Sequence, residues 1–384
     1  MKRILSLTLA LCLCLTLFAC SQEGSSSSEA ESSAASSESS SSAVTSEGSA
    51  SSQVSSEPSE VSSAAASAES EVGSASSASD VDTADLGTAA VAALKGPTAM
   101  GMVKMMSDDA QNDQPTFDFN IYASADEITP KLVQGELDIA AVPANLASVL
   151  YNNTEGQVQV LAINTLGVLY IVENGDTVQS VEDLRGKTIY ASGKGNTPEY
   201  ALRYLLEGNG IDPDADVTME WKSEHSECVA ALAADPAGIA MLPQPFVTTA
   251  QAQNENLRVA LDITEEWDKL AEESGSDAAL LTGVVVARKE FVEQNPQLVG
   301  EFLSLYEKSV AYANEEVEET AKLIGEYDIV PEAVAAKALP ECNITFIEGG
   351  EMKAKLSAYL QTLMDQNPKA IGGAMPGDDF YYAR

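Results

Sequence analysis

Positive charge is scarce in this chain. Its 384 residues include 21 lysines and arginines against 59 aspartates and glutamates, a formal net charge of −38, and a single histidine. Proteins that bind nucleic acid or adhere to anionic lipid do so through basic patches. We therefore expect no nucleic-acid partner and no adhesion to anionic lipid. The net charge does not exclude a local positive charge inside a pocket.

Long apolar runs are missing apart from residues 4–18, and this run is shorter than the ~20 residues of a membrane-spanning helix. It follows two basic residues, and a small alanine precedes Cys20. This is the layout of a secretory signal peptide. Residues 17–20 resemble the lipobox of bacterial lipoproteins, which implies removal of residues 1–19 and lipidation of Cys20. The acyl chains would then anchor the protein to the outer face of the cell membrane. The alternative is an ordinary signal peptide with incidental cysteines.

Aromatic and basic residues are absent from residue 21 to about residue 85, where the chain is almost entirely Ser, Ala and Glu. A segment of this composition does not bury enough apolar surface to offset its ordering entropy. We expect residues 20–87 to form a disordered tether that carries the lipidated cysteine. Its mean reach is on the order of 45 Å, enough to let a folded body reorient above a surface.

Cysteine is rare in the rest of the chain, which contains only Cys228 and Cys342. The two can pair in an oxidising compartment, but they do not make a disulfide framework, and the question stays open. There is no His-Glu-x-x-His motif and no cluster of cysteines or histidines to hold zinc. The glycine-rich residues 193–197 lack the spacing of a phosphate-binding P-loop. We expect no cofactor and no metal.

The single histidine, His225, has Glu224 and Cys228 close to it in sequence. A general base needs an oriented carboxylate and a nucleophile nearby, so this stretch has the elements of a catalytic site. The alternative is the start of a helix, with Ser223 as its N-cap and Glu227 among its first residues. We favour the helix start and expect no enzyme activity.

The remaining three hundred or so residues exceed what one hydrophobic core usually supports, so two lobes are expected. Apolar or alternating stretches predict strands at residues 89–94, 117–122, 137–142, 158–163, 167–172, 188–191, 239–242, 259–261 and 281–287. Helices are expected between most of these strands, though none is placed between residues 261 and 281, and through most of the chain after residue 288. This alternation predicts an α/β protein with parallel, doubly wound sheets and ligand sites at the carboxyl ends of the strands.

The strand at residues 281–287 comes late in the chain and is expected to return to the first sheet. The chain would then cross between the lobes twice, near residues 164–167 and near residues 282–284. We expect lobe 1 to comprise residues 88–165 and 282–384, and lobe 2 residues 166–281. Proteins with two such crossings close on a ligand between the lobes.

Three stretches, residues 126–140, 180–187 and 240–245, resemble the extracytoplasmic solute-binding proteins of ABC importers. The similarity is to the nitrate, sulfonate, taurine and thiamine-precursor group. It implies a type II periplasmic-binding-protein fold, with two lobes joined by a two-crossover hinge. It also implies a monomer that delivers a small-molecule solute to an ABC permease and its ATPase. A sensory surface lipoprotein of the same fold is the alternative.

Loops that follow predicted strands supply the candidate ligand-binding residues. Lys95, Gly96 and Thr98 leave the first strand and enter a helix, where backbone N–H groups and a hydroxyl can converge on a solute. The second lobe repeats this arrangement in its glycine-rich loop, at Lys194, Gly195, Asn196 and Thr197. In both places a tight turn with a solvated lysine is the simpler alternative.

Further candidates are Asn145 after the third strand, Gln244 between two prolines, and Thr282 at the second crossing between the lobes. Asn164 and Thr165 lie at the first crossing and are considered with them. Each of these can equally serve as a helix cap or in hinge hydrogen bonds. Trp221 and Tyr200 can stack on a flat ring or pack within a lobe. Two helix N-termini and two lysines at one cleft favour a small anionic or zwitterionic organic solute. The resemblance points to a sulfonate-like, taurine-like or nitrate-like solute, with a heteroaromatic thiamine precursor as the alternative.

Overall fold

The computed structural model describes residues 87–384, which belong to one compact unit of the chain. The predicted signal peptide, Cys20 and the predicted tether up to residue 86 lie outside the described residues. The described part contains two β-sheets, and we call each sheet with its helices a lobe. None of the helices in this part is long and apolar enough to cross a membrane.

The first lobe is built on a six-stranded sheet in the order β11-β4-β10-β3-β1-β2. Its strands are β1 (Ala89–Leu94), β2 (Phe117–Tyr122), β3 (Ile139–Pro143), β4 (Val158–Leu166), β10 (Leu281–Arg288) and β11 (Ile344–Ile347). Its helices are α1 (Pro97–Met100), α2 (Val103–Asp109), α3 (Ala125–Gln134), α4 (Ala144–Asn153), α9 (Lys289–Gln294), α10 (Pro296–Glu315), α11 (Val317–Glu326), α12 (Glu332–Ala338) and α13 (Gly349–Gln366). Short 3₁₀ turns η2 (Leu339–Glu341), η3 (Pro368–Ile371) and η4 (Asp378–Phe380) complete it.

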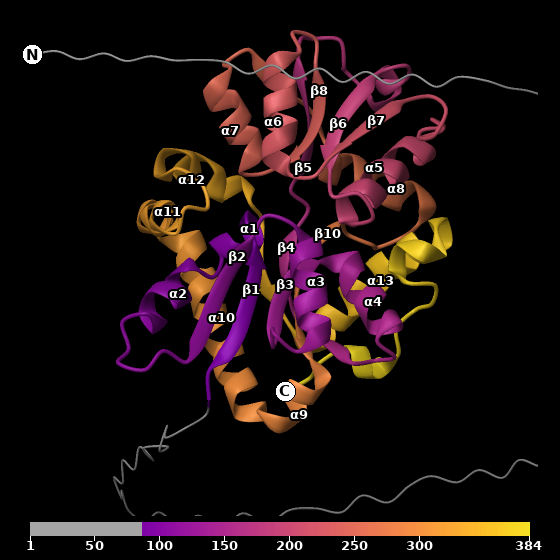
Figure 1. Ribbon diagram of the computed structural model, residues 1–384. Helices are drawn as coiled ribbons and strands as arrows, with labels where there is room; N and C mark the ends of the chain where they lie inside the picture. Colours follow the sequence, from indigo (N-terminus) through magenta and orange to yellow (C-terminus); the bar gives the residue numbers. More distant parts are fainter. Residues whose placement is uncertain (1–86) are drawn as a thin grey trace, which may run out of the picture. The chain divides into compact units, whose positions relative to one another are not determined.

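The second lobe is built on a five-stranded sheet in the order β7-β6-β8-β5-β9. Its strands are β5 (Leu169–Asn174), β6 (Thr188–Ser192), β7 (Thr218–Lys222), β8 (Ile239–Pro243) and β9 (Leu257–Asp262). Its helices are α5 (Thr197–Gly208), α6 (His225–Ala234), α7 (Phe246–Gln253) and α8 (Ile263–Ser274), with the turn η1 (Val181–Leu184). Helices α6 and α7 cover one face of this sheet, and α5 and α8 cover the other (Figure 1).

Buried side chains alternate between the two faces of each sheet, because successive residues of a strand point to opposite sides. In β5, Ile171 packs toward α5 and α8, whereas Val172 packs toward α6 and α7. In the first lobe, Val284 of β10 packs with α4 and α13, and Val285 packs with α2 and α10. Both faces are therefore covered, which explains why the strands are nearly continuous apolar runs.

The fold class is as predicted, but the expectation of purely parallel sheets is wrong. Strands β1, β2 and β3 are parallel, and so are β6, β7 and β8. Strand β10 runs antiparallel to β3 and β4, and β5 runs antiparallel to β8 and β9. A strand that follows a crossing from the other lobe starts at the end of the sheet where the carboxyl ends of the parallel strands lie. It therefore runs antiparallel to those strands.

Several elements were not predicted from the sequence, among them β7, β11 and α8. Strands β7 and β11 are edge strands, and few of their residues are fully buried. An edge strand with exposed side chains lacks the apolar run that marks a central strand. Helix α8 is rich in acidic residues, and its buried face includes Ile263, Trp267 and Ala271.

The chain passes between the sheets twice, from β4 to β5 and from α8 to β10. The hydroxyl of Thr282 in β10 donates to the carbonyl of Leu166 in β4, which ties the two crossing segments together. Gly283 lies so close to β4 that a Cβ atom there would be 2.4 Å from Asn164 Oδ1 and 3.0 Å from Thr98 Cγ2. This close approach requires glycine at the hinge.

Candidate functional site

The carboxyl ends of the parallel strands of both lobes meet at two neighbouring cavities. Residues at or just after the ends of β1, β3, β6, β7 and β8 line cavities of about 90 and 80 Å³. The two cavities share five lining residues, namely Leu94, Lys95, Pro143, Pro198 and His225. Since both lobes contribute to each lining, a molecule held there would contact both lobes at once.

The first cavity has mostly apolar walls, formed by Leu94, Pro97, Pro143, Val168, Leu169, Pro198, Pro243 and Phe246. Its hydroxyl groups come from Thr98, Thr165 and Thr282. Among the described residues that line either cavity, Lys95 is the one lysine or arginine. The second cavity adds polar residues from both lobes: Ser124, Ser192, Asn196, Ser223 and Glu224.

The turn after β1 brings Lys95 and Thr98 to the cavity. The Lys95 amide donates to the carbonyl of Tyr122 at 2.8 Å, and the Thr98 hydroxyl donates to the carbonyl of Leu94 at 2.8 Å. Gly96 between them has a φ of 140°, a backbone conformation that residues with a Cβ atom rarely adopt. Gly96 and the Thr98 bond therefore fix the tight turn locally, and the bond to Tyr122 of β2 anchors it at Lys95. Lys95 and Thr98 both lie in the cavity lining.

His225 lies in the lining of both cavities, at the first position of α6. Its Nδ1 atom is 2.5 Å from Ser192 Oγ, and its ring lies 5.0 Å from the Phe246 ring, measured between centroids. Burial lowers the pKa of His225 from 6.5 to about 4, since the charged ring would lose its hydration. At neutral pH the imidazole is therefore uncharged, with one nitrogen as a hydrogen-bond donor and the other as an acceptor.

Cys228 is buried on α6, near Ser192 and His225. Burial raises the pKa of its thiol to about 11, so the thiol remains protonated at neutral pH. Cys342 is also a free, buried cysteine and lies after η2 in the first lobe, and burial raises the pKa of its thiol too. The two cysteines belong to different lobes and do not pair.

The model of a protein family described as "ABC transporter, phosphonate, periplasmic substrate-binding protein" matches residues 102–323. This match covers more than half of the chain and includes segments of both lobes. The chain belongs to this family. Members of the family are the substrate-binding components of ABC transporters, and they act outside the cytoplasm.

Solved structures of such binding proteins share the fold. An ABC transporter structure from Parabacteroides distasonis has a TM-score of 0.64 at 22% identity, and the match covers 77% of this chain and 99% of that one. The periplasmic aliphatic sulphonate binding protein SsuA of Escherichia coli has a TM-score of 0.60 at 16% identity, covering 77% and 92%. The alkanesulfonate-binding protein SsuA of Xanthomonas axonopodis pv. citri, bound to MOPS, has a TM-score of 0.60 at 14% identity, covering 76% and 94%. No curated protein matches the chain in sequence.

Half of the residues predicted to bind the solute lie in the cavity linings of this binding protein. Lys95, Gly96, Thr98 and Thr282 line the first cavity, and Asn196 lines the second. Thr165 also lines the first cavity, whereas Asn164 is fully buried and does not. The structure thus brings residues from four distant parts of the sequence to one place.

The other predicted residues lie outside both linings. Lys194 is exposed, and the Gly195 amide donates to the Glu199 carboxylate at 2.7 Å, so this expected donor is not free. Gln244 is buried and accepts hydrogen bonds from the Thr248 amide and hydroxyl. Asn145 and Thr197 are fully buried and bond to each other. Their amides and hydroxyls are used within the protein, which the sequence alone did not reveal.

The helix start at His225 also differs from the prediction. Glu224, not Ser223, is the N-cap of α6, and no side chain caps this end. Glu227 instead accepts a hydrogen bond from the Ser223 amide at 2.9 Å. His225 and Ser192 were not predicted to line the site, and neither Trp221 nor Tyr200 lines either cavity. Their positions could have indicated a role in the site, because both residues lie at or just after the end of a parallel strand.

Proposed function

We propose that this substrate-binding component captures a small organic anion of the phosphonate or sulfonate type between its lobes. It then delivers the anion, chemically unchanged, to an ABC permease and its ATPase. The observation that carries the proposal is the position of Lys95 in the lining shared by both cavities. No other lysine or arginine lines these cavities in the described part of the chain, so Lys95 determines where an anionic group binds.

Lys95 is the charged donor available to an oxyanion in these linings. The hydroxyls of Thr165 and Thr282 donate within the protein, to Asn164 Oδ1 and to the Leu166 carbonyl, and the neutral His225 ring lies in both cavities. A charge-assisted hydrogen bond from the ammonium group contributes about 1.5–3 kcal/mol to binding. Apolar walls from both lobes complement a short carbon chain attached to the acid group.

Size limits the solute. The two cavities have volumes of about 90 and 80 Å³ and would together hold on the order of six water-sized groups, at about 30 Å³ each. This fits a solute with few non-hydrogen atoms. Two similar folds carry consistent names: one is an aliphatic sulphonate binding protein, and another is a periplasmic nitrate-binding protein, NrtA, from Synechocystis.

A flat, uncharged heteroaromatic ring of the thiamine-precursor kind is the second candidate. The observation in its favour is the apolar wall that includes Phe246, with the neutral His225 ring beside it. Such a ring would stack on these side chains and make little use of the Lys95 charge.

The two candidates are separable by calorimetry on the full chain. Ethylphosphonate, ethanesulfonate, taurine and nitrate form one set of solutes, and a substituted aminopyrimidine forms the other. The proposal requires at least one anion to bind, and to bind more weakly as salt concentration rises. Binding of the pyrimidine alone, unaffected by salt, would overturn the anion proposal and support the second candidate.

Catalysis is not part of the proposal. A nucleophilic cysteine must be a thiolate, and the Cys228 thiol has a pKa raised to about 11. His225 Nδ1 is engaged by Ser192 instead of by an orienting carboxylate. A solute recovered unaltered after incubation, checked by mass spectrometry, is the expected result.

We further propose that residues 1–19 are a signal peptide and that lipidated Cys20 anchors a monomer to the outer face of the membrane. The two predicted lobes, residues 88–165 with 282–384 and residues 166–281, would then move above a tether formed by residues 20–87. Metabolic labelling with a fatty acid tests the anchor. The Cys20→Ser variant is expected to lose the label and to be released from the membrane.

A further inference from the structure

Asn145, at the start of α4, is fully buried and forms hydrogen bonds with both lobes. Its Nδ2 atom donates to the carbonyl of Ala370 in η3 of the first lobe at 2.9 Å. The same atom donates to the carbonyl of Gly195 in the second lobe at 3.2 Å, and its Oδ1 atom accepts from the Thr197 hydroxyl at 3.3 Å. One amide therefore joins three segments that are far apart in the sequence.

The contact continues through Thr197 and Tyr359. The Thr197 hydroxyl is also 3.1 Å from the hydroxyl of Tyr359, which lies on α13 of the first lobe. All three side chains are fully buried. Buried polar groups of this kind are costly when they lose their partners without full access to water. If the lobes separated here, the bonds of Asn145 to Gly195 and Thr197 and the bond of Tyr359 to Thr197 would all break.

The loop that Asn145 holds also forms part of the proposed binding site. Gly193 and Asn196 of this loop line the second cavity, and Pro198, which follows it, lines both. Gly195 and Thr197 face Asn145 instead. The bonds to Asn145 on one side of the loop therefore fix the position of the cavity wall on its other side.

We propose that Asn145 is a positioning residue for solute binding, a clasp between the lobes that holds residues 193–198 in place only when the lobes are closed. Asn145 lines neither cavity, so it acts on the solute through this loop. The inference rests on the proposed function for its effect on affinity, but not for its effect on lobe closure. Loss of the clasp should speed solute release and leave the association rate nearly unchanged, since the clasp forms only after the lobes meet.

Asn152 offers a matched control on the same helix. Its Nδ2 atom donates to the carbonyls of Ile371 and Ala374, both at 2.8 Å, and these bonds stay within the first lobe. Asn145→Ala and Asn152→Ala thus remove the same kind of amide from α4, and each removes at least one hydrogen bond to the C-terminal segment. Only the first removes a contact with the second lobe.

The experiment measures ethylphosphonate binding to the full chain by stopped-flow fluorescence, and lobe separation by the distance between spin labels at exposed Gln134 and Ala230. We expect about a tenfold faster dissociation for Asn145→Ala, a change of less than twofold for Asn152→Ala, and a broader distance distribution for the first variant only. Thr197→Val removes the shared hydroxyl with almost no change of volume and should act in the same direction, which covers the case that Asn145→Ala fails to fold.

Equal dissociation rates for the two asparagine variants, or unchanged rates in Asn145→Ala and Thr197→Val, would overturn the clasp. If the unsubstituted chain binds no ethylphosphonate or other anion, the proposed function fails instead. The spin-label distances, measured without solute, then test by themselves whether Asn145 holds the lobes together. Identical distance distributions in all variants would refute it.

Discussion

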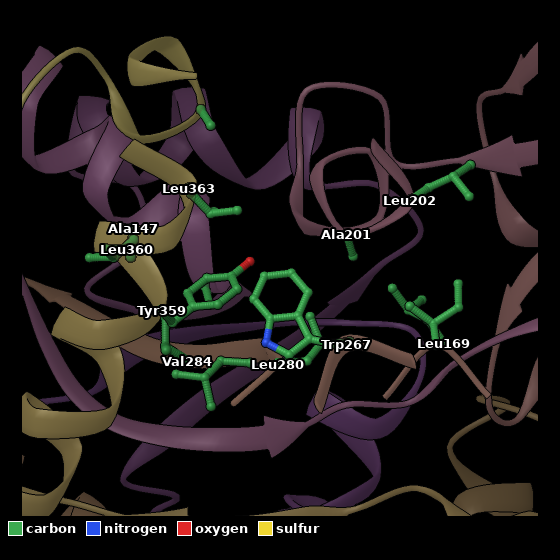
Figure 2. Close-up of a cluster of buried hydrophobic side chains, with 14 of the residues drawn as sticks. Ala147, Leu169, Ala201, Leu202, Trp267, Leu280, Val284, Tyr359, Leu360 and Leu363 are labelled. Atoms are coloured by element: carbon green, nitrogen blue, oxygen red, sulfur yellow. The ribbon is translucent and has the colours of Figure 1, made fainter. Parts of the chain in front are cut away.

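The indole of Trp267 and the phenol ring of Tyr359 lie 5.8 Å apart, centroid to centroid, although they belong to different lobes. Both are buried, in a cluster that also includes Ala201, Leu280, Val284 and Leu360 (Figure 2). The Trp267 Nε1 atom donates to the carbonyl of Ala278 at 2.7 Å, in the segment that leads back to β10. Beside the Asn145 clasp, the closed lobes therefore also bury apolar side chains against each other.

This apolar contact between the lobes predicts unequal roles for the two tryptophans of the chain. Trp267→Ala should lower the free energy of unfolding by about 3–5 kcal/mol, because it opens a cavity between the lobes. Trp221→Ala, at the half-buried edge strand β7, should cost less than half of that. Urea unfolding of both variants measures the difference. Equal losses would mean that the Trp267 contact does not stabilise the fold more than an edge residue does.

The two lysines that looked equivalent in the sequence should differ in binding. Lys95→Met should weaken binding of an anionic solute about 10- to 100-fold, since it removes a charge-assisted hydrogen bond inside the cavity. Lys194→Met should change affinity less than threefold, because Lys194 is exposed and lines neither cavity. Calorimetry at low and moderate salt provides the comparison. A larger effect at Lys194 would place the anion outside the described cavities.

Stability should fall as the pH is lowered through the range set by His225. The unfolded chain takes up a proton near pH 6.5, whereas the folded chain resists protonation of this ring until about pH 4. Between these pH values protonation favours the unfolded state. The stability that neutral His225 gives the folded state is therefore fully present above pH 6.5 and is lost as the pH falls toward 4. At pH 5 the loss from this residue should be at most about 2 kcal/mol.

The variant His225→Gln isolates this effect, because the chain has one histidine. Urea unfolding at pH 7.5 and pH 5 should show a smaller loss of stability in the variant than in the unsubstituted chain. The carboxylates titrate in both proteins, so the comparison cancels them. An identical loss in both proteins would show that the ring is not held neutral in the fold.

Two glycine substitutions should have opposite signs. Gly283→Ala places a methyl group against Asn164 and Thr98 at the hinge, and we expect a loss of about 1–3 kcal/mol of stability together with weaker solute binding. Gly300→Ala lies inside α10, where nothing is within 4 Å of the added carbon, and should stabilise by about 0.5–1 kcal/mol. Thermal unfolding with and without solute measures both. Weaker binding in Gly300→Ala would contradict the assignment of the effect to the hinge.

Central strands and their helices were predictable from the sequence because burial on both faces leaves a recognisable apolar run. The late strand at residues 281–287 also indicated a return to the first sheet, and β10 does so. The direction of β5 and β10 was not predictable, since an apolar run has the same composition in either direction. The direction of each strand depends on which end of the sheet the chain enters after it crosses between the lobes.

The sequence by itself determined the turn at Lys95, Gly96 and Thr98, because a glycine with positive φ and local hydrogen bonds fix it within a few residues. Only the tertiary structure decided which face of each loop meets the cavity. Residues 193–197 resemble the first turn in composition, yet Gly195 and Thr197 bond to Glu199 and Asn145 and not to the cavity. His225 and Ser192 come together across 33 residues for the same reason. Local preferences set backbone shape, whereas side-chain partners depend on which buried groups the packing of the two lobes brings within hydrogen-bond distance.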